Sequence, residues 1–440
     1  TPINYWLTDH QQKIYFEQRI LKSEPIGSDS EINKIEIDET QRFQSMDGFG
    51  YTLTGGSAQL IHNLQDSQRS ELLQNLFSLN GDSIGVSFLR ISIGASDLDE
   101  SVFSYDDLPE DETDIDLKKF SLDNDLKHLI PILKEILLIN PDIKILGSPW
   151  SPPAWMKTNG NTKGGSLKPE YYSVYAQYIV KYIQQMMLHN IKIYSITPQN
   201  EPLHPGNNPS MLMLPKEEAE FIKHLGLAFR QNKLETKIWA YDHNCDRPDY
   251  PIEILQDPEA AQYVDGSAFH KYAGEITALT ELHQKFPDKN VYFTEQWIGG
   301  PSDFQGDFSW HIRVLMIQGP TNWAKVVLEW NLAADEEYKP HTPGGCLNCL
   351  GAVTISDQKV KKETAYYIIA HLAKLVRPGA VRIFSSQIEM LPNVAFQGLN
   401  GEKVLLVLND SPEKKKFRFE VGGQQVVAEL GSGAAATFVW

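Results

Sequence analysis

The stretch YYSVYAQYIVKYIQQMMLHNIKIYSITPQNEP, residues 171–202, contains one complete unit of the fold. Residues 171–190 carry apolar side chains at helical spacing, which predicts a long amphipathic helix. The run IKIYSI at 191–196 predicts a buried strand. In the loop after it, Pro198 and Pro202 flank an amide and a carboxylate, Asn200 and Glu201. A helix, a strand and a polar loop in this order form the repeating unit of a parallel α/β sheet.

The same alternation recurs about eight times between residues 43 and 375. The expected strands lie in the segments 44–56, 85–94, 143–150, 191–196, 236–244, 265–272, 290–297 and 324–332, with helices expected at 67–78, 128–140, 171–190 and 216–232. Eight such units predict a (β/α)₈ TIM barrel. A doubly wound open sheet is the alternative. It is disfavoured because no Gly-x-Gly-x-x-Gly follows a strand, and because polar residues recur at strand ends throughout the region.

The sequence pattern changes on both sides of the barrel region. From residue 376 onward, short alternating runs separated by glycine and asparagine turns predict an all-β module. Two alternating runs near the other end, 13–20 and 33–39, are expected to join it. We therefore expect a β-sandwich built from both ends of the chain, with domains at 1–42 (N-terminal strands), 43–375 (catalytic barrel) and 376–440 (C-terminal sandwich).

Composition excludes several classes of function. The 440 residues are 41% hydrophobic and 22% charged, which is typical of a globular enzyme-sized protein. A net charge of −17 argues against binding to nucleic acid or to an anionic membrane by charge. No apolar run approaches the ~18 residues of a membrane span, so no integral membrane segment is expected. The chain starts without Met, and we expect a secreted, periplasmic or cell-surface protein whose signal peptide has been removed.

The cysteines predict neither a disulfide framework nor a metal site. There are three, and Cys346 and Cys349 form a lone C-x-x-C without a second pair. A structural zinc site needs four ligands, and only His341 is near in sequence. We expect no metal; a local disulfide and two free thiols both stay open for the pair.

The candidate site follows from the barrel itself, because a TIM barrel carries its active site at the C-terminal strand ends. Those ends hold Arg90 and Asp97 (second strand), Trp150 (third), Asn200 and Glu201 (fourth), Asp242 and His243 (fifth), His270 and Tyr272 (sixth), Glu295 and Trp297 (seventh), and Trp330 and Asn331 (eighth).

Two carboxylates at corresponding depths, Glu201 and Glu295, are the equipment of glycoside hydrolysis, in which one stays protonated and the other ionised. Aromatic rings at Trp150, Tyr272, Trp297 and Trp330 are expected to cover the apolar faces of sugars, and Asn200 to hydrogen-bond a 2-hydroxyl. Each residue alone has a plainer explanation. Loop acids are usually solvated, tryptophans usually pack in cores, His243 and His270 could be satisfied structural histidines, and Arg90 could simply pair with Asp97. The functional interpretation rests on their coincidence at one end of one barrel.

Six motifs in order along the chain carry a family resemblance: MDGFG (46–50), FLRISIGASD (88–97), SPWSPPAWMKTNG (148–160), TPQNEP (197–202), YFTEQW (292–297) and LEWNL (328–332). Together they resemble glycoside hydrolase family 30, which includes glucosylceramidases and β-1,6-glucanases. The resemblance implies a retaining mechanism with Glu201 as acid/base and Glu295 as nucleophile, and no cofactor. It also implies substrate-binding roles for Arg90, Asp97, Trp150, Asn200, His270, Tyr272 and Trp330. Asp242 matches less closely, and Trp297 departs from the glucosylceramidase pattern.

Specificity is the open part of this hypothesis. The loop LHPGNNPSML (203–212) is more similar to bacterial relatives of the β-1,6-glucanases, so the preferred interpretation is an endo-β-1,6-glucanase acting on a carbohydrate partner. A glucosylceramidase or general β-glucosidase is the alternative, and β-fucosidase or β-xylosidase activity stays open. Met211, Leu212 and Met213 could form an apolar rim for a lipid aglycone, or could be core packing. A catalytically dead carbohydrate-binding barrel is a distant alternative, because both carboxylates are present.

Overall fold

The computed structural model describes residues 2–27 and 31–440. Eight strands close into a parallel barrel in chain order, which confirms the predicted (β/α)₈ fold and rules out the open sheet. These strands are β5 (Gly48–Thr52), β6 (Phe88–Ile93), β7 (Lys144–Pro149), β8 (Ser195–Ile196), β9 (Lys237–Cys245), β10 (Val264–Gly274), β11 (Asn290–Glu295) and β12 (Ala324–Asn331). The fourth strand is shorter than predicted, since only two residues of the apolar run at 191–196 are in regular pairing.

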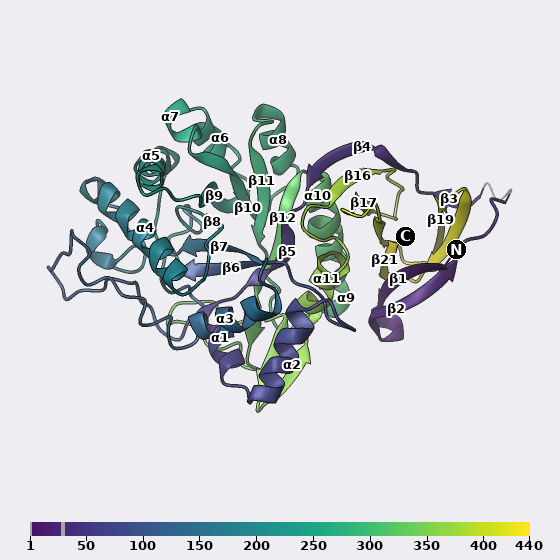
Figure 1. The fold of residues 1–440 in the computed structure, drawn as a ribbon, viewed down its shortest axis with the longest axis horizontal. Coiled ribbons are helices and arrows are strands. Elements are labelled where there is room, and N and C mark those ends of the chain that lie inside the picture. The colour runs from purple at the N-terminus through teal and green to yellow at the C-terminus, as the bar shows by residue number, and fades with distance from the viewer. Residues whose placement is uncertain (1, 28–30) are drawn as a thin grey trace.

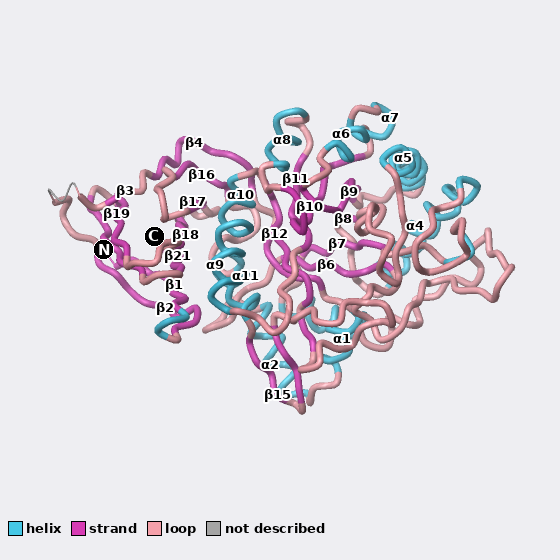
Figure 2. The backbone as a smooth tube through the Cα atoms, turned by 180° about the vertical axis from the view of Figure 1, so that it is seen from behind, coloured by secondary structure: helices cyan, strands magenta, loops and turns pink. Residues whose placement is uncertain are grey.

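Helices surround the barrel and bury its outer face (Figures 1 and 2). They are α1 (Gly55–His62), α2 (Asp66–Phe77), α3 (Leu129–Ile139), α4 (Tyr172–Leu188), α5 (Pro215–Gln231), α6 (Asp249–Leu255), α7 (Pro258–Ala261), α8 (Ala278–Lys285), α9 (Phe304–His311), α10 (Gln318–Thr321) and α11 (Thr364–Ala373). A π-helical segment, Ile312–Ile317, joins α9 to α10, and short 3₁₀ turns occur at His10–Gln12, Ala154–Met156 and Pro169–Tyr171.

The period-2 alternation of strands separates two apolar layers. In β6, Leu89 and Ile91 belong to the outer layer between strands and helices, while Phe88 belongs to the barrel interior. Arg90, two residues after Phe88, therefore points into the barrel close to its C-terminal mouth. The interior below it is filled by seven buried residues, Phe88, Leu146, Trp239, Ala268, Tyr292, Val326 and Leu328.

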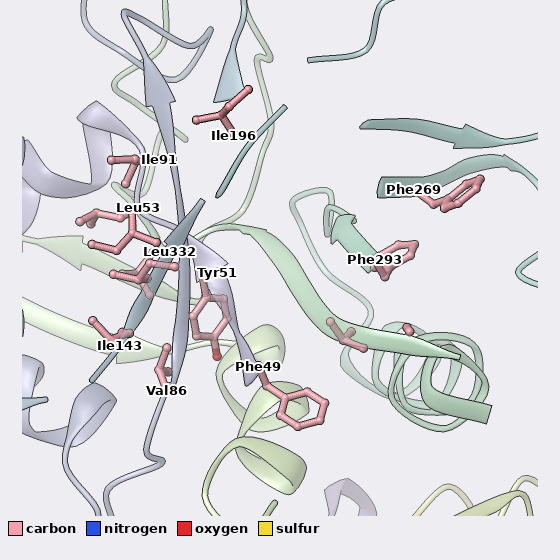
Figure 3. Packing of buried hydrophobic residues seen from close by; sticks show 14 of the residues in the cluster. Phe49, Tyr51, Leu53, Val86, Ile91, Ile143, Ile196, Phe269, Phe293 and Leu332 are labelled. Carbon is pink, nitrogen blue, oxygen red and sulfur yellow. The ribbon is translucent and has the colours of Figure 1, made fainter. Parts of the chain in front are cut away.

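The outer layer is the larger core. Figure 3 shows part of this outer layer, with Leu53, which follows the C-terminal end of β5, next to Leu332. The backbone supports this contact, because Leu332 N donates to Thr52 O and Leu53 N donates to Arg90 O. Strands β5, β6 and β12 are thereby held in register where the site residues emerge.

The β-sandwich is built from both ends of the chain, as predicted, and lies beside the barrel (Figure 1). Its larger sheet has the order β2-β1-β21-β18-β17-β16-β4 and its smaller sheet β20-β19-β3. The strands are β1 (Pro2–Asp9), β2 (Ile14–Lys22), β3 (Asn33–Lys34), β4 (Ile37–Ser45), β16 (Val381–Ser385), β17 (Asn393–Gln397), β18 (Lys403–Leu408), β19 (Lys415–Val421), β20 (Gln424–Leu430) and β21 (Ala435–Val439). The last strand lies between β1 and β18.

A small sheet follows the eighth barrel strand and was not predicted. It consists of β13 (Ala333–Ala334), β14 (Val353–Ser356) and β15 (Lys359–Lys362), and the loop between β13 and β14 returns to the barrel mouth. Across residues 2–27 and 31–440, no helix has the length and apolar character needed to span a bilayer.

Candidate active site

The strand ends surround a pocket of about 260 Å³ at the mouth of the barrel. Nine of the residues predicted at the strand ends line it, together with five others: Asp97, Trp150, Asn200, Glu201, His204, Asn207, His243, Asn244, Tyr272, Glu295, Trp297, Trp330, Cys346 and Cys349. Arg90 contacts Glu295 and His270 contacts Glu201, and the Asp242 carboxylate binds both Arg90 and His270.

Glu295 is the last residue of β11 and is almost fully buried, at 5% exposed. Arg90 Nη1 donates to one of its carboxylate oxygens at 2.8 Å, and the Tyr272 hydroxyl donates to the other at 2.8 Å. Both oxygens thus accept a hydrogen bond, one of them from a cation, which stabilises the ionised form. A fixed, ionised carboxylate is what a nucleophile requires.

Glu201 approaches the pocket from the loop after β8. Its backbone is in the left-handed region, with φ at 46°, which is uncommon for a residue with a side chain. The conformation is held because Glu201 N donates to Asp242 O at 3.1 Å. The carboxylate then meets His270, whose Nδ1 lies 2.9 Å from Glu201 Oε2.

Asp242 links the two carboxylates and is fully buried. Its Oδ2 accepts from Arg90 Nη2 at 2.8 Å and its Oδ1 accepts from the Thr294 hydroxyl at 2.7 Å. His270 Nε2 lies 2.7 Å from the same Oδ1. One aspartate therefore fixes the arginine that contacts Glu295 and the histidine that contacts Glu201.

A β-bulge turns Asp242 inward. Along β9, Tyr241 pairs with Ala268 but His243 pairs with the next residue, Phe269, so Asp242 is the extra residue. Tyr241 and Asp242 both have positive φ, at 77° and 66°. Trp239 lies in the barrel interior, and the bulge sends Tyr241 to the outer layer and Asp242 to the interior. Bulges of this kind re-aim side chains next to active sites.

The charged groups of this cluster shift one another's pKa values. The pKa of Asp242 is held well below its usual range, because the charges of Arg90 and His270 outweigh the effect of burial. Burial lowers the pKa of His270, but the charges of Glu295 and Asp242 outweigh it and raise the value to about 9. Burial raises the pKa of Glu295 and the charge of Glu201 adds to this, with His270 and Arg90 opposing. For Glu201, burial is outweighed by the hydrogen bond and charge of His270, so its pKa is lowered.

Aromatic rings form one wall of the pocket. Trp150 and Trp330 stack on each other with ring centroids 5.5 Å apart, and the Arg90 guanidinium lies 4.9 Å from the Trp150 ring. Both tryptophans are largely buried, so only part of each ring faces the pocket. A disulfide between Cys346 and Cys349 packs against them, which settles the question that the sequence left open. Cys245 is buried and free.

Three predicted residues have contacts that the sequence did not indicate. Arg90 does not pair with Asp97; its ion-pair partners are Asp242 and Glu295, so that alternative is wrong. Asp97 instead accepts from Cys346 N at 3.0 Å, and burial raises its pKa. Asn200 Oδ1 accepts from Arg90 Nη2 at 2.7 Å. Asn200 lines the pocket, and within the described part of the chain no protein group accepts a hydrogen bond from its Nδ2.

Sequence reasoning missed several lining residues, namely His204, Asn207, Asn244 and the two cysteines as part of the wall. His204 and Asn207 lie in the loop at 203–212 that was singled out for specificity, so their presence could have been inferred from that loop. His243 was noted only as a rim histidine; its Nε2 lies 3.8 Å from Glu201 Oε2. Met211 and Met213 are fully buried, so they pack in the core and form no apolar rim.

Glu201, His270 and Glu295 offer ligand atoms that all lie within 4.8 Å of one another, close enough to hold a cation. Two carboxylates and an imidazole are an ordinary donor set for zinc. His270 already uses both nitrogens, toward Glu201 and Asp242. These contacts join Glu201, His270 and Asp242 into one hydrogen-bonded chain.

Comparison with known proteins identifies both parts of the chain. Residues 46–376 match the model of the glycosyl hydrolase family 30 TIM-barrel domain, and residues 379–438 match the family 30 β-sandwich domain. An endo-1,6-β-D-glucanase of Neurospora crassa is 35% identical over 364 residues, which cover 79% of this chain and 74% of that protein. The lysosomal acid glucosylceramidase of Mus musculus is 29% identical over 408 residues, covering 86% of this chain and 78% of the mouse protein. A solved structure described as an endo-β1,6-glucanase superposes with a TM-score of 0.92 at 32% identity, over 100% of this chain and 99% of that one.

Proposed function

Because this chain belongs to glycosyl hydrolase family 30 and is a glycoside hydrolase, we propose that it is a retaining endo-β-1,6-glucanase. The observation that carries the mechanism is the closeness of the two carboxylates. An oxygen of Glu201 and an oxygen of Glu295 lie within 4.8 Å of each other, and both lie beside His270. Inverting enzymes hold their carboxyl groups about 6.5–9.5 Å apart to admit a water, whereas retaining enzymes hold them about 5–5.5 Å apart.

In the first step a Glu295 oxygen attacks the anomeric carbon as the glycosidic C–O bond breaks. The leaving oxygen takes a proton from Glu201. In the second step Glu201 removes a proton from water, the water oxygen attacks the same carbon, and the bond to Glu295 breaks. Two inversions give net retention, and Glu201 ends with the proton it began with. Arg90 and Tyr272 hold Glu295 in position throughout.

The proton for the first step is stored in the Glu201–His270 hydrogen bond. Asp242 stays ionised, so His270 directs Nε2–H at Asp242 and the remaining proton lies between Nδ1 and Glu201 Oε2. In the free site the raised pKa of His270 favours the imidazolium–carboxylate form. As the leaving oxygen gains negative charge, the Nδ1 proton moves to Glu201 and from Glu201 to the leaving oxygen, which leaves His270 neutral with Nε2–H on Asp242; the proton that Glu201 takes from water in the second step restores the pair. The pair thereby acts as one general acid.

Two observations support the glucanase over the glucosylceramidase. The endo-1,6-β-glucanases of three fungi are each 35% identical to this chain, and the mouse glucosylceramidase is 29% identical. The candidate apolar rim for a lipid aglycone also lacks support, because Met211 and Met213 are buried and the half-buried Leu212 does not line the pocket. Trp297 and His204 both line the pocket, and we assign them to its leaving-group side.

Product analysis tests the substrate. We expect thin-layer chromatography to show short β-1,6-linked oligomers from a linear β-1,6-glucan. Glucose should be released from glucosylceramide slowly or not at all. Proton NMR of the first products should show the β-anomer before mutarotation. Rapid release of glucose from glucosylceramide with the glucan left intact would overturn the glucanase assignment, and an initial α-anomer would overturn retention.

Azide rescue tests the two roles separately. With a dinitrophenyl β-glucoside, whose leaving group needs no proton, Glu201→Ala should form the covalent intermediate and turn over faster when azide is added, giving a β-glucosyl azide. Glu295→Ala should give an α-glucosyl azide, because azide then replaces the nucleophile. Glu201→Ala should reduce kcat on the glucan by about 10²–10⁴, and Glu295→Ala should remove the covalent step altogether. The opposite stereochemistry in the two variants would exchange the roles.

We also propose export to an oxidising compartment, which the Cys346–Cys349 disulfide supports because such bonds persist there. Thiol titration of the protein, denatured without a reducing agent, should count one free cysteine of the three. A count of three would place the protein in a reducing compartment.

A further inference from the structure

A ridge of two antiparallel segments closes one side of the catalytic pocket. Residues 297–301 and 346–350 pair through Gly300 N to Asn348 O at 2.8 Å and Leu350 N to Ile298 O at 3.0 Å. The Cys346–Cys349 disulfide ties the second segment to itself. We call these two segments the disulfide ridge.

The disulfide ridge has a second cavity on its other side. Trp297, Cys346 and Cys349 line the catalytic pocket, whereas Pro301 and Leu350 line a separate cleft of about 1090 Å³. The cleft lies between the sandwich, the small sheet and α11, since Tyr15 of β2, Ser356 of β14 and Tyr367 of α11 all line it. It is larger than the roughly 300–1,000 Å³ of a typical small-molecule site.

The lining of the cleft fits a neutral, polyhydroxylated ligand. Four partly exposed aromatic side chains contribute: Tyr15, Phe304, Tyr338 and Tyr367. The rings of Tyr15 and Tyr367 have centroids 5.2 Å apart, so they offer a joined apolar surface. Charges of both signs alternate around them, with three lysines (359, 361, 362) and four carboxylates (335, 336, 357, 363). This near balance gives no net attraction for an anion such as a nucleic acid or a phosphopeptide, while supplying donors and acceptors for hydroxyl groups.

The catalytic pocket alone is too small for a polymer. Its volume of about 260 Å³ lies below that of a typical small-molecule site, so a glucan cut within its length has to continue outside. The backbone from Trp297 to Pro301 spans at most about 14 Å. One chain crossing the disulfide ridge can therefore contact both cavities.

We propose that this cleft is a distal subsite that binds further glucose units of the same β-glucan chain. The inference rests on the proposed function. Tyr15 and Tyr338 act as its sugar platforms. Tyr338 also packs against Gly300 of the disulfide ridge, where an added Cβ would meet its ring within 2.5 Å.

The test compares long and short substrates in the full-length enzyme. The double variant Tyr15→Ala/Tyr338→Ala removes two platforms, and Ser356→Trp fills the cleft without removing packing. Tyr263→Ala is the matched control, because it removes a half-buried tyrosine that lines neither cavity. Each is assayed on a high-molecular-weight β-1,6-glucan and on an aryl β-glucoside. Binding is measured separately by affinity electrophoresis in gels that contain the same glucan. For this experiment each change is combined with Glu295→Gln, so that the glucan is not cleaved.

We expect both cleft variants to raise KM for the long glucan about tenfold, with matching loss of electrophoretic retardation, because each ring contact contributes on the order of 1 kcal/mol. Rates on the aryl glucoside should stay within twofold, as should every rate of the control. Equal loss on both substrates, or unchanged KM for the long glucan in a folded Ser356→Trp enzyme, overturns the distal subsite alone. A wild type that leaves the β-1,6-glucan intact overturns the proposed function, and this inference with it.

Discussion

His270 is the residue on which the two carboxylates depend, since it lies 2.9 Å from Glu201 and 2.7 Å from Asp242. In His270→Asn, Glu201 loses the partner that stores its proton. We expect kcat/KM to fall about 10²–10³-fold. The basic limb of the pH profile, which the pKa of about 9 places near pH 9, should move to lower pH because Glu201 then has to hold the proton alone.

The pH dependence of kcat/KM on an aryl glucoside measures this limb in the free enzyme. His243→Asn is the matched control, because His243 Nε2 lies 3.8 Å from Glu201 and, among residues 2–27 and 31–440, its ring makes no hydrogen bond to Asp242. Its basic limb should stay in place. A His270→Asn enzyme that loses rate with an unchanged basic limb would show that His270 only positions the carboxylates.

At this scale the sequence predicts which side chains meet at the barrel mouth but not how they are connected. Glu201 and Glu295 are predictable because strand ends of a barrel converge on one mouth. The ion pairs of Arg90 were not predictable from spacing, since its true partners lie 152 and 205 residues away. Asp242 was the least certain of the predicted residues, because the bulge that turns its side chain inward cannot be seen in the sequence. In the structure it contacts both Arg90 and His270.

The bulge in β9 is supported from the helix side. Glu218 of α5 is fully buried, and its Oε2 accepts from Tyr241 N at 2.9 Å, the amide that the bulge removes from the regular ladder. Burial raises the pKa of Glu218 to about 8, and the charge of Asp242 adds to this. The unfolded chain would ionise this group near its ordinary value of about 4.3.

A raised folded pKa means that the native state holds a proton which the unfolded state has released. The contribution of Glu218 to stability is therefore complete below about pH 4 and is lost as the pH rises toward 8. Glu218→Gln keeps an acceptor for Tyr241 N and cannot ionise. We expect its Tm relative to wild type to improve by a few °C between pH 5 and pH 8.

Differential scanning calorimetry at several pH values measures this difference. Glu220→Gln on the same helix is the control, because Glu220 is exposed and pairs with Lys223 on the surface. Its Tm difference should not change with pH. A Glu218→Gln difference that is constant from pH 5 to pH 8 would contradict the buried, proton-bearing state.

Among the elements, long periodic helices and apolar strands were predicted from the sequence and the short ones were not. The helices α3, α4 and α5 have 11, 17 and 17 residues, enough for a helical period to show. Strand β13 has only two residues, which is too few for any alternation, whereas β8 was predicted from the apolar run at 191–196, although only two residues of that run pair regularly. The small sheet of β13–β15 was hidden for this reason.

For the whole molecule, one histidine joins the barrel to the sandwich. His371 of α11 is fully buried between Thr8 of β1, 2.7 Å away, and Thr437 of β21, 2.9 Å away. In His371→Leu both threonine hydroxyls lose this partner. Each buried group left short of a hydrogen bond costs about 1–3 kcal/mol, so we expect the free energy of unfolding to fall by about 2–4 kcal/mol.

Urea unfolding followed by tryptophan fluorescence measures the loss. Thr437→Val, which removes one of the two contacts, should cost about half as much. Activity of His371→Leu on the aryl glucoside at 25 °C should match wild type, since His371 does not line the pocket. A change below about 1 kcal/mol would show that the interface is held by its apolar packing alone.

The pairing of β1 with β21 has a consequence for synthesis on the ribosome. β1 leaves the exit tunnel before the barrel and the rest of the sandwich, yet its partner follows more than 400 residues later, with Tyr5 opposite Phe438. At about 5–20 residues per second, roughly 20–85 s pass before that neighbour is made. During this time β1 and β2 present an unpaired edge that invites association with other nascent chains. Slower initiation, lower temperature or a holdase chaperone should therefore raise the yield of folded enzyme more than any change in the barrel.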